Sequence, residues 1–198
     1  MNNYIYTPAN SFSKLSKIKS FLKLGGFISG GCFKNIFKNE SIRDLDIFFE
    51  NEQQYEKALE TVKSNKRRYK FIYANDNCES FYDRVIKVRF ELVKSQFGSP
   101  EEIIDKFDFS ITKFALFNNE TYDEAYCVYH DKFFEHLMTN KLVIQSDVLN
   151  PVAALNRVFK YNTYGYGLCR ESKVTLIREV MSRGEISSID NNLYFGFD

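Results

Sequence analysis

The sequence predicts an α/β core over residues 1–148, with a small helical portion over residues 149–198 that packs on it. Runs of β-branched and aromatic residues alternate with stretches whose apolar residues recur at helical spacing. From Pro151 onward the pattern is helical. With 3 prolines and 9 glycines among 198 residues, no Pro- or Gly-rich linker divides the chain, so we expect one folded unit.

The first predicted helix covers residues 12–24, where Leu15, Ile18 and Leu22 share one face and lysines fall on the other. A basic amphipathic helix of this kind can lie on a membrane surface, but we expect it to cover the core. The other predicted helices are residues 32–38, 51–65, 99–107, 151–161 and 171–183. The predicted strands are residues 44–49, 70–74, 85–93, 107–116 and 125–130.

Composition excludes several classes of protein. The 27 basic and 26 acidic residues give a net charge of +1, so any attraction for nucleic acid must come from a local cluster. The 4 cysteines form no C-x-x-C pair, which is typical of reduced thiols. No signal peptide and no apolar stretch of about 18 residues is found, so we expect an intracellular, cytoplasmic protein without a membrane span.

Two carboxylates begin the predicted strand over residues 44–49. Asp44 and Asp46 are two positions apart, so both side chains project from the same face of the strand. Two carboxylates this close repel each other unless a cation lies between them, and carboxylate oxygens suit Mg²⁺ or Mn²⁺. We therefore expect Asp44 and Asp46 to bind a metal.

A glycine pair precedes the short predicted helix over residues 32–38. Gly30 and Gly31 would let a phosphate approach the backbone at the helix N-terminus, and we expect Gly31 to adopt a positive φ. A phosphate site beside a metal site is the minimum equipment for phosphoryl or nucleotidyl transfer.

These motifs resemble the signature of the polymerase-β-type nucleotidyltransferase superfamily, and they are most similar to the head domain of CCA-adding enzymes and bacterial poly(A) polymerases. That signature has a Gly-Gly, a short helix and an Asp-x-Asp that opens an apolar strand. Residues 107–116 resemble the second motif of the family through Asp108 and Thr112. Residues 150–166 resemble its neck helix through Pro151, Arg157 and Gly165, with Arg157 one residue out of register.

The resemblance implies a nucleotidyltransferase-type mixed sheet flanked by helices. It also implies transfer of a nucleoside monophosphate from a nucleoside triphosphate to a hydroxyl, with release of pyrophosphate. The acceptor would be an RNA 3′ end, tRNA included, a protein or a small molecule. The implied catalytic residues are Asp44, Asp46 and Asp108, and the implied nucleotide-binding residues are Gly30, Gly31, Lys34, Arg157 and Lys160.

Two acids are candidates for a third carboxylate near the metal. If residues 107–116 form one strand, Asp108 lies on one face with Ser110 and Thr112. Glu91, on another predicted strand, is the alternative. An acid between two phenylalanines needs a partner if it is buried, which favours Asp108.

Departures from the family pattern leave a second function open. Lys34-Asn35 replaces an Arg-Asp, and Lys106-Phe107 replaces an arginine pair. The positions that read the base fall on Leu149, Asn150 and Ala153, which predicts weak base discrimination. The alternative is a catalytically inactive member that binds nucleotide, RNA or a protein, in a toxin–antitoxin or phage–host interaction.

The densest basic run, residues 63–70, joins the predicted helix over residues 51–65 to the predicted strand over residues 70–74. It contains Arg67, Arg68 and Lys70 with Tyr69 among them. Such a run is usually a solvated surface, and with an interleaved aromatic residue it could instead contact an RNA backbone.

Overall fold

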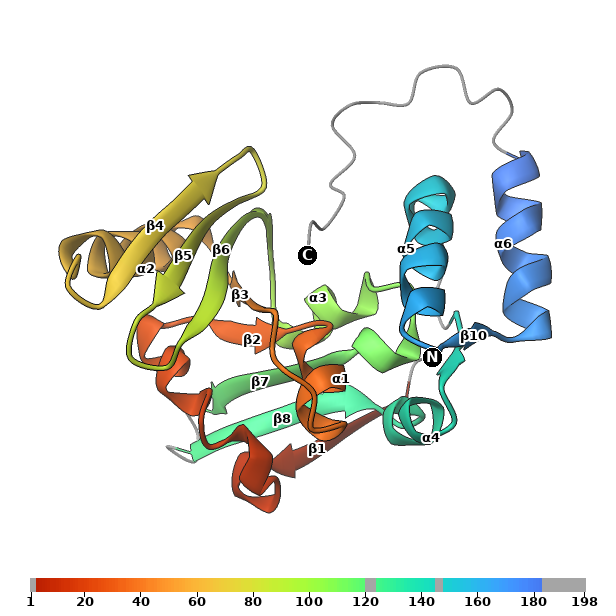
Figure 1. Cartoon of the computed structure of the whole chain (residues 1–198), viewed down its shortest axis with the longest axis horizontal. Helices are drawn as coiled ribbons and strands as arrows, with labels where there is room; N and C mark the ends of the chain where they lie inside the picture. The colour runs from red at the N-terminus through yellow and green to blue at the C-terminus, as the bar shows by residue number, and fades with distance from the viewer. Residues whose placement is uncertain (1–2, 120–123, 145–147, 183–198) are drawn as a thin grey trace.

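A computed structural model describes residues 3–119, 124–144 and 148–182 of the chain (Figure 1). Its centre is an eight-stranded sheet with the order β1-β8-β7-β2-β3-β6-β5-β4. Neighbouring strands run antiparallel except β3 and β6, which are parallel. The mixed sheet and its flanking helices confirm the predicted fold class.

The strands of this sheet are β1 Tyr4–Pro8, β2 Phe27–Ser29, β3 Asp44–Phe49, β4 Tyr69–Ala74, β5 Cys78–Asp83, β6 Val88–Phe97, β7 Phe114–Asn119 and β8 Glu124–His130. The α-helices are α1 Cys32–Phe37, α2 Glu52–Ser64, α3 Pro100–Asp105, α4 Phe133–Met138, α5 Pro151–Thr163 and α6 Arg170–Ser182. The short 3-10 helices are η1 Ala9–Ser11, η2 Ser13–Leu15, η3 Lys19–Leu24 and η4 Ser110–Thr112.

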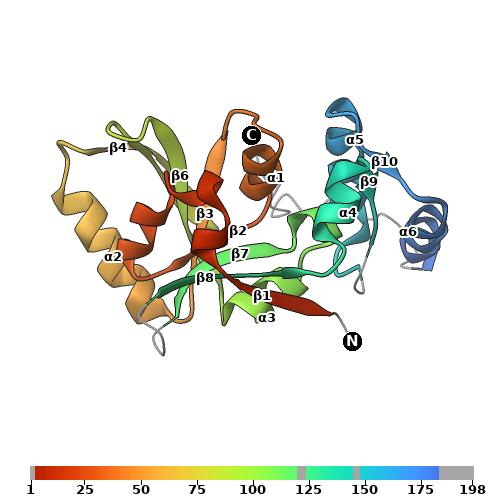
Figure 2. The ribbon, with the colours of Figure 1, turned by 90° about the horizontal axis from the view of Figure 1, so that it is seen from below.

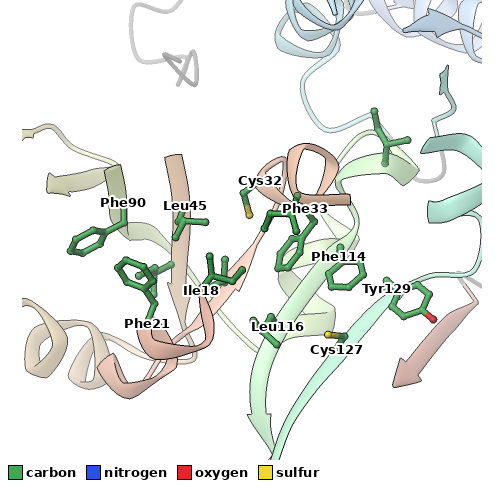
Figure 3. Packing of buried hydrophobic residues seen from close by; sticks show 14 of the residues in the cluster. Ile18, Phe21, Cys32, Phe33, Leu45, Phe90, Phe114, Leu116, Cys127 and Tyr129 are labelled. Atoms are coloured by element: carbon green, nitrogen blue, oxygen red, sulfur yellow. The ribbon is translucent and has the colours of Figure 1, made fainter. Parts of the chain in front are cut away.

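The buried apolar residues form two clusters, one on each face of the sheet. On the first face, Leu45 of β3 and Phe90 of β6 pack against the N-terminal segment, where Figure 3 shows Ile18. Successive strand residues point to opposite faces, so Phe48 of β3 lies on the second face, in one cluster with Ile103 of α3. Figure 2 accordingly shows α1 and α3 on opposite sides of β7 and β8. Asp44 and Asp46 share the second face with Phe48.

The helices α5 and α6 pack together beside one end of the sheet (Figure 1). Two short parallel strands, β9 Lys141–Leu142 and β10 Gly167–Leu168, tie the segment before α5 to the segment after it. The predicted last helix ends within the described residues at Ser182, and the predicted C-terminal portion beyond that position lies outside them. Across residues 3–119, 124–144 and 148–182, no helix is long and apolar enough to cross a membrane.

The predicted helix over residues 12–24 is wrong in type. The segment forms η2 and η3, with hydrogen bonds between residues three apart, such as Leu15 N to Phe12 O at 3.0 Å. It ends at Gly25, which has a φ of +83°. Leu15 and Ile18 are fully buried, so docking onto the sheet determines the path of the chain.

The predicted strand over residues 107–116 is also wrong in its first half. Ser110 begins η4 and its hydroxyl lies 2.7 Å from His136 Nδ1, while Lys113 Nζ donates to Asp105 O at 2.9 Å. These contacts hold the segment in a turn, so β7 starts only at Phe114. Asp108, Ser110 and Thr112 therefore do not line one face of a strand.

Candidate functional site

A cleft of about 420 Å³ lies where the loop before α1, the second face of β3 and the helix α5 meet. Its lining residues include Gly30, Gly31, Lys34, Arg43, Asp44, Asp46, Asp108, Leu149, Asn150, Ala153, Arg157, Lys160, Tyr161 and Tyr164. Every residue predicted to be catalytic or nucleotide-binding is therefore in one cavity. Residues that are far apart in the sequence, such as Asp46 and Lys160, line the same cavity because α5 lies beside the end of the sheet.

The glycine pair connects β2 to α1 and forms one edge of the cleft. Gly30 N donates to Phe114 O at 3.2 Å, and Gly30 has a φ of +96°. A Cβ on Gly30 would lie 3.3 Å from Asp46 Oδ2, so the glycine allows the backbone and the carboxylate to approach each other. Gly31 has a φ of −66°, so the expected positive φ is wrong for Gly31 and belongs to Gly30.

The two aspartates of β3 face the parallel neighbour β6, whose residues Arg89 and Glu91 lie opposite them in register. Arg89 Nη2 donates to Asp44 Oδ2 at 2.8 Å. Burial raises the pKa of Asp46 well above its usual range, and the negative charges of Asp44 and Glu91 raise it further. Lys160 and Arg89 lower this pKa in part. The folded protein therefore disfavours the ionised form of Asp46.

Neither candidate for a third carboxylate completes a three-acid cluster. Asp108 Oδ2 accepts from Arg157 Nε at 2.6 Å, and this ion pair occupies the acid. Glu91 accepts from Tyr73 Oη at 2.6 Å and from the Cys78 thiol at 3.4 Å. Within the described ranges, no group of three or more His, Cys, Asp or Glu side chains is placed to hold a metal ion.

The chemistry of Asp46 nevertheless fits a divalent cation. No hydrogen-bond donor in the described part of the chain reaches its half-buried carboxylate, and its acidic neighbours repel the ionised form. Oxygen atoms of Asp44 and Asp46 are ligands that Mg²⁺ or Mn²⁺ prefers, and both ions accept water and phosphate oxygens as further ligands. A metal here would therefore have these two carboxylates as its protein ligands.

Arg89 competes with a metal for Asp44, which yields a testable expectation. Arg89→Gln should lower the Tm of the metal-free protein by about 2–4 °C, since a half-buried ion pair of ~1 kcal/mol is lost. It should raise the affinity for Mn²⁺ at least about tenfold, because a cation beside the carboxylates is removed. Titration of free Mn²⁺ by electron paramagnetic resonance measures this. Arg84→Gln removes the same charge from an exposed turn and should change neither value. Weaker Mn²⁺ binding in Arg89→Gln would show that Arg89 supports the metal site.

The predicted nucleotide-binding cations line the same cleft as the acidic pair. Lys34 Nζ lies 3.2 Å from Glu40 Oε2 and 5.1 Å from the ring centre of Tyr164. Burial lowers the pKa of Lys34, and the pairing with Glu40 partly restores it. Arg157 pairs with Asp108, and Lys160 is close enough to act on the charge of Asp46. All three cations thus share one cavity with Asp44 and Asp46.

Sequence reasoning missed Arg43, which stacks on the ring of Tyr164 at 4.2 Å and also donates to its hydroxyl. It also missed Arg89. Arg43 directly precedes Asp44 in the sequence, and this position could have identified it as a candidate. Arg89 is identified only by the pairing of β6 with β3.

The basic run after α2 does not line the cleft. Arg68 pairs with the buried Asp83 at 2.8 Å, so it serves the fold. Arg67 and Lys70 are exposed. Of the three residues predicted to contact RNA, Arg67 and Lys70 are therefore still candidates.

The fold is that of the nucleotidyltransferase head of CCA-adding enzymes. A CCA-adding enzyme in complex with ATP superposes with a TM-score of 0.66 at 16% identity, over 90% of this chain and 47% of that chain. The Thermotoga maritima CCA-adding enzyme in complex with tRNA gives a TM-score of 0.60 at 13% identity, over 90% of this chain and 46% of that chain. This similarity establishes the fold, and the chain spans just under half of each of these proteins.

A relative of known name comes from Bacillus phage SPbetaL7. That protein, Gabija anti-defense 2, is 28% identical over 158 residues, which cover 78% of this chain and 36% of the relative. The chain thus corresponds to about a third of that protein. The model of the family described as Gad2, Gabija anti-defense 2 family protein, matches residues 4–140. That match covers well over half of the chain, including the glycine pair and the acidic pair, so the chain belongs to the Gabija anti-defense 2 family.

Proposed function

We propose that this chain is a metal-dependent nucleotidyltransferase that transfers a nucleoside monophosphate from a nucleoside triphosphate to a hydroxyl acceptor. We propose further that the transfer counteracts Gabija defence, as the name of its phage relative suggests. One observation carries the catalytic proposal. Asp46 is half-buried beside Asp44, its Oδ2 would lie 3.3 Å from a Cβ on Gly30, and no described residue donates a hydrogen bond to its carboxylate. A carboxylate in this state lowers stability unless a cation binds.

The residues divide the work of the reaction between them. Lys34, Arg157 and Lys160 bind the triphosphate, and Gly30 leaves its backbone open to it. Asp44 and Asp46 hold Mg²⁺ or Mn²⁺, which supplies charge neutralisation at the reacting phosphate. The acceptor oxygen forms a bond to the α-phosphorus, the bond from that phosphorus to the bridging oxygen breaks, pyrophosphate leaves and the hydroxyl proton passes to water.

Asp108, which was predicted to be catalytic, is proposed to position its partner Arg157. The 2.6 Å ion pair places its carboxylate against Arg157, so we assign to Asp108 the orientation of that guanidinium toward the triphosphate.

Label transfer tests the proposal. The protein is incubated with each α-labelled triphosphate, Mg²⁺ or Mn²⁺, and total cell RNA and protein. We expect label in one class of macromolecule, and none with Asp46→Asn. A small-molecule acceptor is covered by following labelled products that pass a size filter. Absence of labelled product in every fraction, with a nucleotide that binds, would contradict the enzyme assignment.

A second candidate function is nucleotide binding without transfer. It is favoured by the absence of a three-acid cluster from the described residues and by the ion pair that Arg89 makes with Asp44. Thermal shift separates the two candidates, because a ligand that binds the folded state raises the Tm. A rise with triphosphate and Mg²⁺, together with no label transfer, supports the second function.

The base of the triphosphate should be read only weakly. Asn150 Oδ1 accepts from Ala153 N at 3.0 Å to cap α5, so this carbonyl is engaged, and Leu149 offers an exposed apolar side chain. Base discrimination needs paired hydrogen bonds of ~1–3 kcal/mol each. We expect ATP against GTP, or CTP against UTP, to differ in kcat/KM by at most about tenfold, or ~1.4 kcal/mol. Initial rates at sub-saturating concentration measure this, and a thousandfold preference would contradict it.

A further inference from the structure

Five exposed cations gather at the end of the sheet where β3 begins. Lys66, Arg67 and Lys70 lie around the start of β4, while Arg84 and Lys87 lie in the turn between β5 and β6. Arg84 N donates to Arg68 O at 2.9 Å, which joins the two segments. In the ranges that the structure describes, none of the five side chains has an acidic partner. We call these five residues the basic surface.

Asp83, which directly precedes Arg84 in the sequence, makes its hydrogen bonds within the fold. Asp83 is fully buried and accepts from Arg68 Nε at 2.9 Å, from Val85 N at 2.8 Å and from Ile86 N at 3.1 Å. Asp83 therefore neutralises the charge of Arg68 and accepts the backbone hydrogen bonds of the turn. Its charge is thus used by Arg68 and not by the five residues of the basic surface. Lys87 has a φ of +59°, a conformation that glycine or asparagine adopts more easily. A lysine thus occupies a left-handed position of the turn.

A row of side chains connects the basic surface to the acidic pair. Lys70, Tyr82, Arg89 and Asp44 are successive partners across β4, β5, β6 and β3, so all four project from one face of the sheet. Three strand spacings of about 4.8 Å separate Lys70 from Asp44, or roughly 14 Å. The row alternates a cation, an aromatic ring and a cation before it reaches the carboxylates.

We propose that the basic surface binds the phosphodiester backbone of a nucleic-acid strand whose terminal hydroxyl lies at Asp44 and Asp46. This inference rests on the proposed function and names its acceptor class. A strand in helical form advances about 3.4 Å per nucleotide, so ~14 Å spans about four nucleotides. Phosphates repeat along such a strand and match cations spread over two segments, while Tyr82 offers a ring for stacking.

Binding without chemistry tests this surface. A 20-nucleotide RNA of mixed sequence with a 5′ fluorescein is titrated by fluorescence anisotropy in EDTA, without triphosphate, at several salt concentrations. Arg67→Gln with Lys70→Gln, and Arg84→Gln with Lys87→Gln, should each weaken binding at least about tenfold at low salt. Each double variant should reduce the slope of log K against log[salt] by about 1.4, at ~0.7 per phosphate contact on a single strand.

Two controls keep the test specific. Lys17→Gln with Lys23→Gln removes the same charge from exposed lysines of the N-terminal segment, which covers the other face of the sheet, and should leave affinity within about twofold. Arg84→Lys with Lys87→Arg retains both charges and should retain binding, which separates loss of charge from loss of fold.

Failure of this inference is distinguishable from failure of the proposed function. Asp46→Asn should bind the RNA as well as the unmodified chain does, although it transfers nothing. Unchanged RNA binding in both double variants would overturn the basic surface. Equal competition by poly-glutamate of matched length would also overturn it, in favour of an acidic protein partner. Label transfer to a protein without RNA binding would overturn the inference while the enzyme assignment stands.

Discussion

Asp46→Asn should abolish nucleotidyl transfer and at the same time stabilise the metal-free protein. Loss of a metal ligand removes several kcal/mol of transition-state stabilisation, so we expect the rate to fall by at least about 10³-fold. Stability should rise because the variant removes a half-buried carboxylate that Asp44 and Glu91 repel. Each unit of pKa shift corresponds to about 1.4 kcal/mol, so a gain of ~1 kcal/mol or more, or about 2–4 °C in Tm, is expected.

Asp44→Asn is the matched control, and its stability should change in the other direction. It should also abolish transfer, but it removes the partner of Arg89 at 2.8 Å, so the Tm should fall. Label transfer and thermal unfolding in EDTA measure both effects. If Asp46→Asn unfolds, or if either variant keeps its activity, the acidic pair is not the metal site.

The stabilising effect of Asp46→Asn should depend on pH. Because the folded protein raises the pKa of Asp46, the native state holds a proton that the unfolded chain releases near its usual value of about 3.9. Stability of the metal-free protein should therefore fall as pH rises from about 4 toward the raised pKa. Asp46→Asn lacks this contribution. The Tm difference between variant and unmodified protein in EDTA should be larger at pH 8 than at pH 5.

Gly30→Val should raise the KM for the triphosphate by about a hundredfold and should also lower the Tm. A β-branched residue at a φ of +96° costs about 1–3 kcal/mol, and its Cβ would lie 3.3 Å from Asp46 Oδ2. The displaced carboxylate and the blocked backbone both weaken phosphate binding, and a hundredfold loss equals about 2.7 kcal/mol.

Gly25→Val separates backbone strain from the loss of the site. Gly25 has a φ of +83°, and a Cβ there would meet no atom within 4 Å. This variant should lose similar stability but bind triphosphate normally. Steady-state kinetics and thermal unfolding of both variants provide the comparison. Equal KM values for Gly30→Val and Gly25→Val would place the phosphate site elsewhere.

Local patterns predicted the parts of the fold that depend on local physics. Residues 44–49 form β3 as expected because the two aspartates at its start flank an apolar Leu45 and are followed by three apolar residues. Residues 99–107 contain α3 as expected because Ser99 and Glu102 form a capping box around its first turn, which begins at Pro100. The glycine pair and the acidic pair are brought together by the same short-range logic, since one helix and one loop separate them.

Local sequence patterns did not predict the features that depend on contacts between residues far apart in the sequence. Lys113 is fully buried and donates to Asp105 O, and no periodicity of the sequence predicts a lysine in the core. Arg89 meets Asp44 only because β6 runs parallel to β3, and that pairing cannot be read from either strand alone. Asp83 looks like any surface acid in the sequence, and its burial beneath the turn is what leaves Arg84 and Lys87 unopposed.

The pairing of β1 with β8 also sets an order of events during synthesis. Residues 4–8 pair with residues 126–130, so β1 leaves the ribosome about 120 residues before its partner. At about 5–20 residues per second, that interval lasts roughly 6–24 s. Throughout it, β1 carries unpaired amides and carbonyls that could join another chain. Among the strands of this sheet, β1 is thus made before all others but must wait for β8, and during that wait it can pair with another chain and aggregate.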